Sequence, residues 1–315
     1  RAISAFDPVV LFFVLGVAAG LARAELRLPA AIYEFVSAIL LLSIGLKGGM
    51  QLAAQPVGGL LGDVALVLLL GVLLPLVAFP VLRLAGRLPR ADAASVAAHY
   101  GSVSVGTFAV AISYAARQGI AYEEHMPLFV VLLEVPAILV GILLARGVSR
   151  RTRWGALAHE LFLGKSIVLL LGGLAIGWAA GEQGLEPVAP LFFDLFKGVL
   201  ALFLLEMGLI ASAQVGGVLR HGFFLLAFGL LAPVAFALVG IGFGVLMGLS
   251  PGGVMLLAVL AGSASYIAAP AAMRTAVPEA NPALSLTASL AVTFPFNILV
   301  GIPLYHRLTA YLLDG

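Results

Sequence analysis

Long apolar runs alternate with short polar or glycine- and proline-containing segments along the whole chain. Each run holds enough residues to cross the roughly 30 Å hydrocarbon core of a bilayer as an α-helix. The alternation therefore predicts an all-α, polytopic membrane protein with ten transmembrane helices. We expect these spans at residues 8–24, 30–53, 58–82, 92–116, 126–146, 163–181, 190–212, 219–248, 252–274 and 283–311.

The two halves of the chain share a sequence pattern. Three pairs of segments correspond, in the same order and at near-constant spacing: 41–52 with 203–214, 97–106 with 259–268, and 134–142 with 293–302. One match between apolar sequences can arise by chance, but three in register indicate duplication. Because each half holds five predicted spans, an odd number, the second half must enter the membrane from the opposite face. We expect two inverted five-helix repeats, 1–147 and 163–315, joined by a linker at 148–162, as in many secondary transporters.

The composition excludes several classes of protein. Of the 315 residues, 62% are hydrophobic and 10% are charged, whereas about a quarter of the residues in soluble domains carry charge. Cysteine is absent, which excludes a disulfide framework, a thiolate metal site and thiol catalysis. The small excess of basic residues lies in predicted loops, so we interpret it as a signal of orientation and expect no nucleic-acid binding.

Loop charge predicts which side faces the cytoplasm, because cytoplasmic loops are enriched in lysine and arginine. The loops that join spans 1–2, 3–4, 5–6, 7–8 and 9–10 share one side and carry Arg23, Arg27, Arg83, Arg87, Arg90, Arg146, Arg150, Arg151, Arg153, Arg220 and Arg274. The other side has little beyond Arg1, Lys47, Arg117 and Arg307, and holds Glu123, Glu124, Glu182 and Glu186. We therefore expect both termini outside the cytoplasm and the linker inside it.

Two short segments rich in glycine and serine interrupt predicted spans at corresponding places in the two halves. Glycine lets the backbone leave helical geometry, and the new helix start then presents free N–H groups and a partial positive charge. Such a start inside a protein is suited to an anion. The predicted anion-binding residues are Gly101, Ser102, Val103, Ser104, Gly262, Ser263, Ala264 and Ser265. Close helix packing through small residues is the alternative reading of each segment taken alone.

Glu134 lies inside an apolar span, just before Pro136. An ionisable residue at that depth is by default a functional candidate. Its counterpart in the second half is close to Thr293, with Asn297 one turn later. Oxygen ligands from Thr107, Glu134, Thr293 and Asn297 suit a hard cation such as Na⁺. The alternative is a structural carboxylate that pairs with an arginine or caps the proline break.

Other residues point less clearly to chemistry. His99 can titrate near neutral pH, but a single histidine in a helix is more often simply hydrogen-bonded. A membrane protease would need a serine, a base and an orienting group; Ser102 and His99 are three residues apart on one predicted helix, but no third orienting group is evident. A channel would need repeated selectivity groups along a water-filled path. One pair of broken helices fits an alternating-access carrier better than a channel.

Lys47 and Asp63 have the positions of residues at the ends of spans, so we interpret them as structural.

Several segments resemble one known family. LLSIGLKGGMQLA, the Gly/Ser segment at 101–107, LEVPAILVGI, and the run APAAMRTAVPEANPALSL at 268–285 are similar to the SbtA-type sodium-dependent bicarbonate transporter family. The resemblance covers essentially the whole chain. It is densest around the IGLxGGM segment and the PxxxRxxxPxANP run that begins at Pro270.

The resemblance implies more than the residues alone do. Members have ten helices, with a gate or scaffold part from spans 1, 2, 6 and 7 that forms a homotrimer, and a core part from spans 3–5 and 8–10. They import HCO₃⁻ with Na⁺, by an elevator-like shift of the core, in the bacterial inner membrane. A PII-like cytoplasmic regulator is a further partner that the family suggests, although the sequence itself gives no support for it.

The sequence departs from the family pattern at two positions. Tyr266 stands where the family has a carboxylate after the second serine segment, and Glu134 replaces the usual aspartate. The first departure bears on sodium coupling and on the size of the site. The sequence thus predicts a Na⁺-coupled importer of a small anion, bicarbonate first, with no cofactor beyond the coupling ion. A carrier of another small anion such as a carboxylate, or one driven by H⁺, is the alternative.

Overall fold

The computed structural model describes residues 8–26, 29–53, 60–147 and 154–314, and these residues form helices with no strand. The first half contains α1 (Pro8–Leu21), α2 (Ala30–Leu52), α3 (Leu60–Leu84), α4 (Arg90–Gly101), α5 (Val105–Gln118) and α6 (Met126–Arg146). The second half contains α7 (Trp154–Leu163), α8 (Lys165–Leu185), η3 (Glu186–Val188), η4 (Pro190–Asp194), α9 (Phe196–Leu246), α10 (Pro251–Ala261), α11 (Ala268–Ala276), α12 (Pro282–Leu286), η5 (Thr287–Thr293), α13 (Phe294–Phe296), η6 (Asn297–Gly301) and α14 (Ile302–Asp314).

The prediction of an all-helical, multi-pass membrane protein is confirmed. Within the described residues, eight helical stretches are long and apolar enough to cross a bilayer. They are Ala30–Leu52, Leu60–Leu84, Arg90–Gln118, Met126–Arg146, Lys165–Val188, Phe196–Gly217, Gly222–Leu246 and Pro282–Leu313. The other two of the ten predicted spans correspond to the shorter apolar helices α1 and α10.

Some sequence predictions fall on parts of the chain that the structure does not describe. These are the first seven residues with Arg1, Arg27, the start of the third predicted span at 58–59, and the beginning of the linker at 148–153 with its three arginines.

The 51-residue element α9 contains two of the membrane-crossing stretches. Gly222 separates them with φ 83° and ψ 175°, a left-handed conformation that costs glycine little because it has no β-carbon. The predicted loop between spans 7 and 8 is therefore a sharp bend within one nearly continuous helical element.

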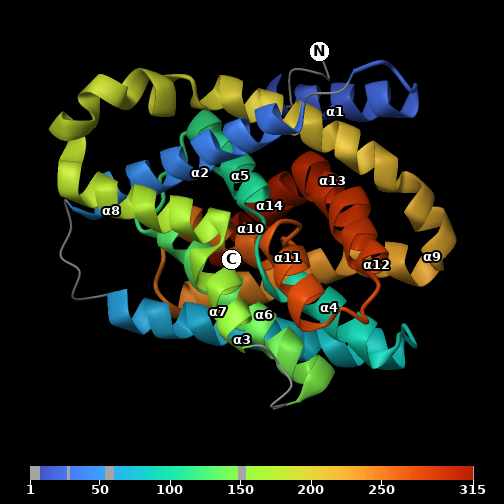
Figure 1. The fold of residues 1–315 in the computed structure, drawn as a ribbon. Helices are drawn as coiled ribbons and strands as arrows, with labels where there is room; N and C mark the ends of the chain where they lie inside the picture. Colours follow the sequence, from blue (N-terminus) through green and yellow to red (C-terminus); the bar gives the residue numbers. More distant parts are fainter. Residues whose placement is uncertain (1–7, 27–28, 54–59, 148–153, 315) are drawn as a thin grey trace.

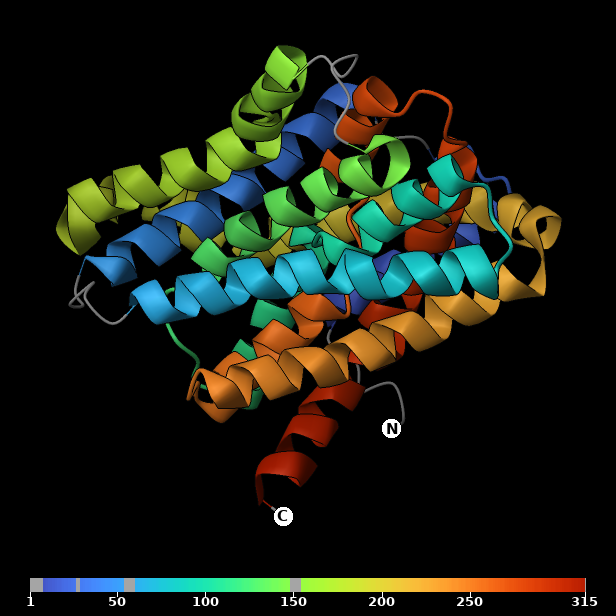
Figure 2. The ribbon, with the colours of Figure 1, turned by 90° about the horizontal axis from the view of Figure 1, so that it is seen from below.

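Two pairs of apolar helices pack through glycines. α1 lies along the first part of α9, and α2 lies along α8; both views show α2 and α8 side by side (Figures 1 and 2). A β-carbon on Gly16 would lie 3.1 Å from the Cα of Gly208, and one on Gly45 would lie 3.1 Å from the Cα of Gly173. The backbones thus approach closely, as is common between transmembrane helices.

The short helices α4, α5, α10 and α11 occupy the interior, with α3, α8 and α9 around them (Figure 1). Every residue of α10 after its first proline is buried, and so is α4 from Ala93 onward. Large exposed apolar side chains instead lie on the outer helices, as Leu61 and Leu231 do. That distribution suits a chain whose outer surface meets lipid and whose centre holds interrupted helices.

Candidate functional site

The first interruption lies between α4 and α5. The backbone is extended at Ser102 (φ −83°, ψ 179°) and at Ser104 (φ −107°, ψ 111°). The Ser104 hydroxyl oxygen accepts a hydrogen bond from the Thr107 backbone N–H at 3.0 Å, so serine caps the new helix. A β-carbon on Gly101 would lie 2.5 Å from the Cδ of Pro75 in α3. The break therefore starts where only glycine fits against the neighbouring helix.

The second interruption, between α10 and α11, also has a serine hydroxyl at the start of its second helix. The N-cap residue of α11 is Ile267, which makes no side-chain cap bond, and the hydroxyl oxygen of Ser265, two residues earlier, accepts a hydrogen bond from the Ala269 backbone N–H at 3.2 Å. A β-carbon on Gly262 would lie 2.7 Å from the carbonyl oxygen of Pro233 in α9. In both predicted breaks, a serine hydroxyl thus accepts from the first turn of the following helix, and a glycine packs against a proline residue.

The two breaks touch each other. The Ser104 backbone N–H donates to the Ser263 hydroxyl at 3.0 Å, and the Ser265 backbone N–H donates to the His99 carbonyl at 2.8 Å. The side chains of both segments are at most 3% exposed: Ser102, Val103, Ser104, Ser263, Ala264 and Ser265. The Ser102 hydroxyl has no hydrogen-bond partner among the described residues. Sequence segments about 160 residues apart therefore form one buried, hydroxyl-lined place.

Glu134 lies in α6 and is 2% exposed. Its Oε2 has no hydrogen-bond partner within the part of the chain that the structure describes. The side chain lines a cavity of about 170 Å³, here called the Glu134 pocket, together with Lys165 and Ser166 of α8 and with Ile267 and Ala268 at the start of α11. The first turn of α11 and Glu134 thus border the same cavity.

Two of the other predicted sodium ligands have well-defined partners. The Thr107 hydroxyl donates to the Ser104 hydroxyl at 2.9 Å, which places Thr107 at the first break. The Thr293 hydroxyl donates to the Gly229 carbonyl at 2.7 Å and is hydrogen-bonded to the Tyr100 hydroxyl, also at 2.7 Å. Thr293 therefore joins the helical stretch Pro282–Leu313 to α4 and α9.

Asn297 supports the second break. Its Nδ2 donates to the Gly262 carbonyl at 2.8 Å, and its Oδ1 accepts from the Tyr305 hydroxyl at 2.8 Å. In the described part of the chain, no hydrogen bond links any two of Thr107, Glu134, Thr293 and Asn297. The structure therefore does not join the four predicted ligands into one hydrogen-bonded cluster.

The start of α5 faces α2 across a cavity of about 10 Å³, room for no more than one water molecule. Its lining consists of Ser37, Leu40, Leu41, Val105, Gly106, Phe203 and Ile267. The Tyr266 hydroxyl lies against Gly106, and its ring packs edge-on against Phe294 with centroids 5.3 Å apart. Tyr33 stacks on Phe203 with centroids 5.9 Å apart. Aromatic side chains therefore close this side of the site. Sequence reasoning singled out Tyr266 among them, but not Tyr33, Phe203 or Phe294.

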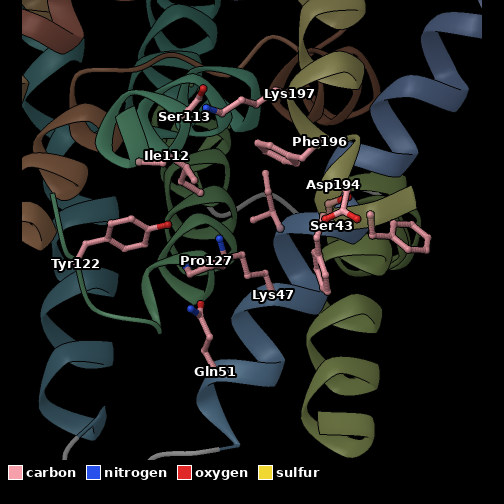
Figure 3. Close-up of a pocket in the computed structure, with 14 residues that line it drawn as sticks. Ser43, Lys47, Gln51, Ile112, Ser113, Tyr122, Pro127, Asp194, Phe196 and Lys197 are labelled. Atoms are coloured by element: carbon pink, nitrogen blue, oxygen red, sulfur yellow. The ribbon is translucent and has the colours of Figure 1, made fainter. Parts of the chain in front are cut away.

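A larger cavity of about 250 Å³ lies between α2, α5, the loop after α5, and the start of α9. We call it the Lys47 pocket. Its polar lining includes Lys47, Gln51, Ser113, Tyr122, Asp194 and Lys197 (Figure 3). Sequence reasoning placed Lys47 at a span end and singled out neither Asp194 nor Lys197. The sequence signal that could have identified Asp194 and Lys197 is their charge, because both lie inside or beside an apolar span.

A multi-pass helical membrane protein in which two interrupted helices meet at a buried hydroxyl-lined site has the features of a secondary transporter. The chain belongs to the Na⁺-dependent bicarbonate transporter superfamily, whose sequence profile matches residues 8–310. This match confirms the family that the sequence resembles. The family is one of transporters, not of enzymes, which agrees with the sequence prediction. A comparison with curated proteins found no match.

Proposed function

We propose that this protein imports bicarbonate together with Na⁺ and binds the anion where the two helix breaks meet. The observation that carries the proposal is the pair of hydrogen bonds between the breaks, Ser104 to Ser263 and Ser265 to His99. They bring the starts of α5 and α11 to one buried place. The partial positive charges of two helix starts then act on the same small volume, which favours a single anion.

The proposed anion contacts come from both segments: Gly101, Ser102, Val103, Ser104, Gly262, Ser263, Ala264 and Ser265. Val105 and Gly106 begin α5, so their N–H groups have no acceptor within the helix. The Ser102 hydroxyl, buried and without a partner among the described residues, is available as a donor. Bicarbonate offers three oxygens to such donors, which suits a site built from backbone N–H groups and hydroxyls.

We assign the sodium ion to Glu134 and the neighbouring oxygens. The buried carboxylate has one oxygen without a partner in the described structure and borders the same cavity as the start of α11. Thr107 is a second ligand candidate at the first break. Thr293 and Asn297 remain predicted ligands, because each oxygen keeps one lone pair beyond its observed hydrogen bonds.

Coupling follows from mutual neutralisation. An anion in a poorly hydrated site is unfavourable alone, and a cation about 4 Å away contributes roughly 4 kcal/mol at an effective dielectric constant near 20. By linkage, each ion then raises the affinity of the other by the same factor. Neither ion alone stabilises the loaded site as well as the pair does.

We further propose the inverted-repeat arrangement, with repeats at 1–147 and 163–315. Corresponding contacts support it. Span 1 packs on span 7 through Gly16 and Gly208, and span 2 packs on span 6 through Gly45 and Gly173. In each interrupted span, likewise, a serine hydroxyl accepts from the first turn of the second part, and a glycine of the first part packs against the preceding span. Under an inverted repeat these pairs are the same contact made twice.

The proposed scaffold consists of α1, α2, α8 and the first part of α9, and the proposed core consists of α3–α6, the second part of α9 and α10–α14. Both breaks then travel with the core in an elevator-like movement. A homotrimer formed by the scaffold, a PII-like regulator on the cytoplasmic side, and a bacterial inner membrane with both termini outside are further predictions from the family and the loop charges.

The test is uptake of labelled bicarbonate into proteoliposomes. Protein-free liposomes measure the background from CO₂ that crosses the lipid unaided. We expect saturable uptake when Na⁺ is present outside, and none above background when choline replaces it. Uptake driven by a pH gradient without Na⁺ would instead support H⁺ coupling. Transport of acetate but not bicarbonate would support the alternative substrate.

A further inference from the structure

The Lys47 pocket contains more positive than negative charge. Lys47 and Lys197 line it together with a single carboxylate, that of Asp194. Among the described residues, neither lysine forms an ion pair with Asp194 within 4.0 Å. Figure 3 shows Lys197 extending toward Ser113, with Asp194 on the far side of the pocket from Tyr122. The two ammonium groups are therefore available to a ligand.

The size of this pocket suits a small hydrated anion. A volume of about 250 Å³ corresponds to roughly eight water molecules at about 30 Å³ each. It falls below the range of about 300–1,000 Å³ that is typical of pockets for drug-sized ligands. Gln51 supplies an amide donor, and burial raises the pKa of Tyr122, so its hydroxyl stays protonated and can donate. These groups match the oxygens of an anion and its water shell.

Three helices, α2, α5 and α9, line both this pocket and the small cavity at the first break. Along α2 the lining passes from Leu41 to Lys47, and along α5 it passes from Gly106 to Ser113. On α9 the small cavity is lined by Phe203, and the large pocket by Lys197, six residues earlier. At 1.5 Å per residue, the pocket lies about 10 Å beyond the start of α5. The pocket and the proposed binding site therefore lie roughly two helical turns apart along the same helices.

We propose that the Lys47 pocket is a second anion site, in which Lys47 and Lys197 hold a small hydrated oxyanion before it reaches the helix breaks. Its role as a loading site rests on the proposed function, whereas anion binding there does not. Both lysines belong to the proposed scaffold, so they remain in place while the core moves. They concentrate the anion at the approach to the site and do not travel with it.

The absence of cysteine from the chain allows a direct test of the local charge. Gln51→Cys introduces one thiol into the pocket of the purified protein. Its rates of modification by an anionic and a cationic methanethiosulfonate reagent are compared at low ionic strength. We expect the anionic-to-cationic ratio to fall about threefold with either Lys47→Gln or Lys197→Gln, and about tenfold with both, the effect of unit charges several ångströms away in wet surroundings.

Two further variants control this measurement. Asp194→Asn should raise the ratio about threefold by the same reasoning. Arg23→Gln removes a positive charge before the other end of α2 and should leave the ratio unchanged. Potassium bicarbonate should slow modification of Cys at position 51, whereas potassium gluconate at equal ionic strength should not. An unchanged ratio in the double lysine variant, or no protection by bicarbonate, would overturn the proposal.

Transport kinetics test the loading role separately. In proteoliposomes, each lysine variant should raise the KM for bicarbonate about threefold with kcat unchanged, while Arg23→Gln changes neither. Sodium-dependent uptake with an unaltered KM in both lysine variants would refute the loading site and leave the proposed function intact. Charge-dependent labelling and bicarbonate protection without any uptake would refute the proposed function and leave the anion site intact. Melting temperatures verify that the variants are folded.

Discussion

The two helix breaks share a plan but differ in what surrounds them. In both, a serine hydroxyl accepts a hydrogen bond from the first turn of the second helical part, and a glycine packs against the preceding span. The start of α5 is closed in by Tyr266 and Phe203 around a cavity of about 10 Å³. The start of α11 instead borders a cavity of about 170 Å³ that also contains Glu134.

The difference shows how one local structure can serve two roles. Both breaks present a helix start, but a buried carboxylate with an oxygen unpartnered in the described structure accompanies the second. In the proposed function, ion coupling therefore depends on a residue outside the duplicated serine segments. We propose that the first break contributes shape and N–H groups, and that Glu134 beside the second holds the cation that attracts the anion.

The largest effect is expected from Glu134→Gln, which removes that charge and keeps the shape. Loss of a carboxylate near the cation is worth about 2 to 4 kcal/mol, so the KM for Na⁺ should rise roughly 30- to 1,000-fold in proteoliposome uptake. Glu279→Gln, which changes an exposed carboxylate, serves as the matched control. Sodium activation that is unaltered in Glu134→Gln would remove Glu134 from the site.

The serine caps should differ in their effect on stability. The Ser104 hydroxyl oxygen accepts two hydrogen bonds, both from Thr107, whereas that of Ser265 accepts one, from Ala269. Ser104→Ala should cost about 1–3 kcal/mol because it leaves both the backbone N–H and the hydroxyl of buried Thr107 without this acceptor. Ser265→Ala removes the acceptor of one N–H only, that of Ala269, and should cost about 1 kcal/mol. Thermal unfolding in detergent shows which of the two variants loses more stability.

Both serine variants should also raise the KM for bicarbonate in the uptake assay, since both caps belong to the proposed site. If neither variant changes uptake, the anion binds elsewhere.

A smaller effect is expected from Tyr266→Phe, which removes the hydroxyl that lies against Gly106. The first turn of α5 then becomes more accessible to the anion. A new hydrogen bond from this turn to the anion, worth about 1 kcal/mol, should lower the KM for bicarbonate several-fold. The KM for Na⁺ should not change at saturating bicarbonate. A KM for bicarbonate equal to that of the unaltered protein would mean that the first break takes no direct part in binding.

The smallest effect concerns the ion pair near the end of α11. Arg146 Nη2 lies 2.6 Å from Glu279 Oε2, and both side chains are partly exposed. Slight burial is the largest single contribution and raises the pKa of Glu279, but the hydrogen bond from Arg146, a backbone hydrogen bond and the charge of Arg146 together outweigh it and lower the pKa below the ordinary 4.5. The pair therefore stabilises the protein above about pH 4.5, and this stabilisation is lost as the pH falls through the lowered value.

Arg146→Gln should accordingly lower the free energy of unfolding by less than about 1 kcal/mol at neutral pH, as for other exposed pairs. The difference from the unaltered protein should vanish in strongly acidic solution. A difference that persists when Glu279 is protonated would show that Arg146 acts through other contacts, such as packing of its stem.

The sequence predicted the parts of the site that depend on local chemistry. Glycine followed by two serines indicated a broken helix in each half, and both breaks are present, with Ser104 as the N-cap of α5 and with the Ser265 hydroxyl accepting from the first turn of α11. Partners distant in sequence could not be predicted in the same way. Thr293 and Asn297 are hydrogen-bonded to α9, α4, α14 and the second break, which no spacing along one helix reveals.

Span lengths and cavities show the same limit. Apolar runs do not reveal that α1 and α10 end sooner than a full span, because that depends on packing and on where the breaks fall. The Lys47 pocket gathers residues from 43–51, 112–127 and 192–197. Their proximity follows from the packing of α2 against α5 and α9, so only the structure brings the lysines together.

The most direct test of the coupled site is the reciprocal effect of the two ions on binding. The Kd for bicarbonate is measured calorimetrically on purified protein with saturating Na⁺ and with choline, and the Kd for Na⁺ is measured with and without bicarbonate. The two ratios should be equal and should exceed about tenfold for ions a few ångströms apart. In Glu134→Gln, Na⁺ binds more weakly, so at the Na⁺ concentration that saturates the unaltered protein the Kd for bicarbonate should approach its value in choline. A bicarbonate Kd that is the same in sodium and in choline would contradict the account.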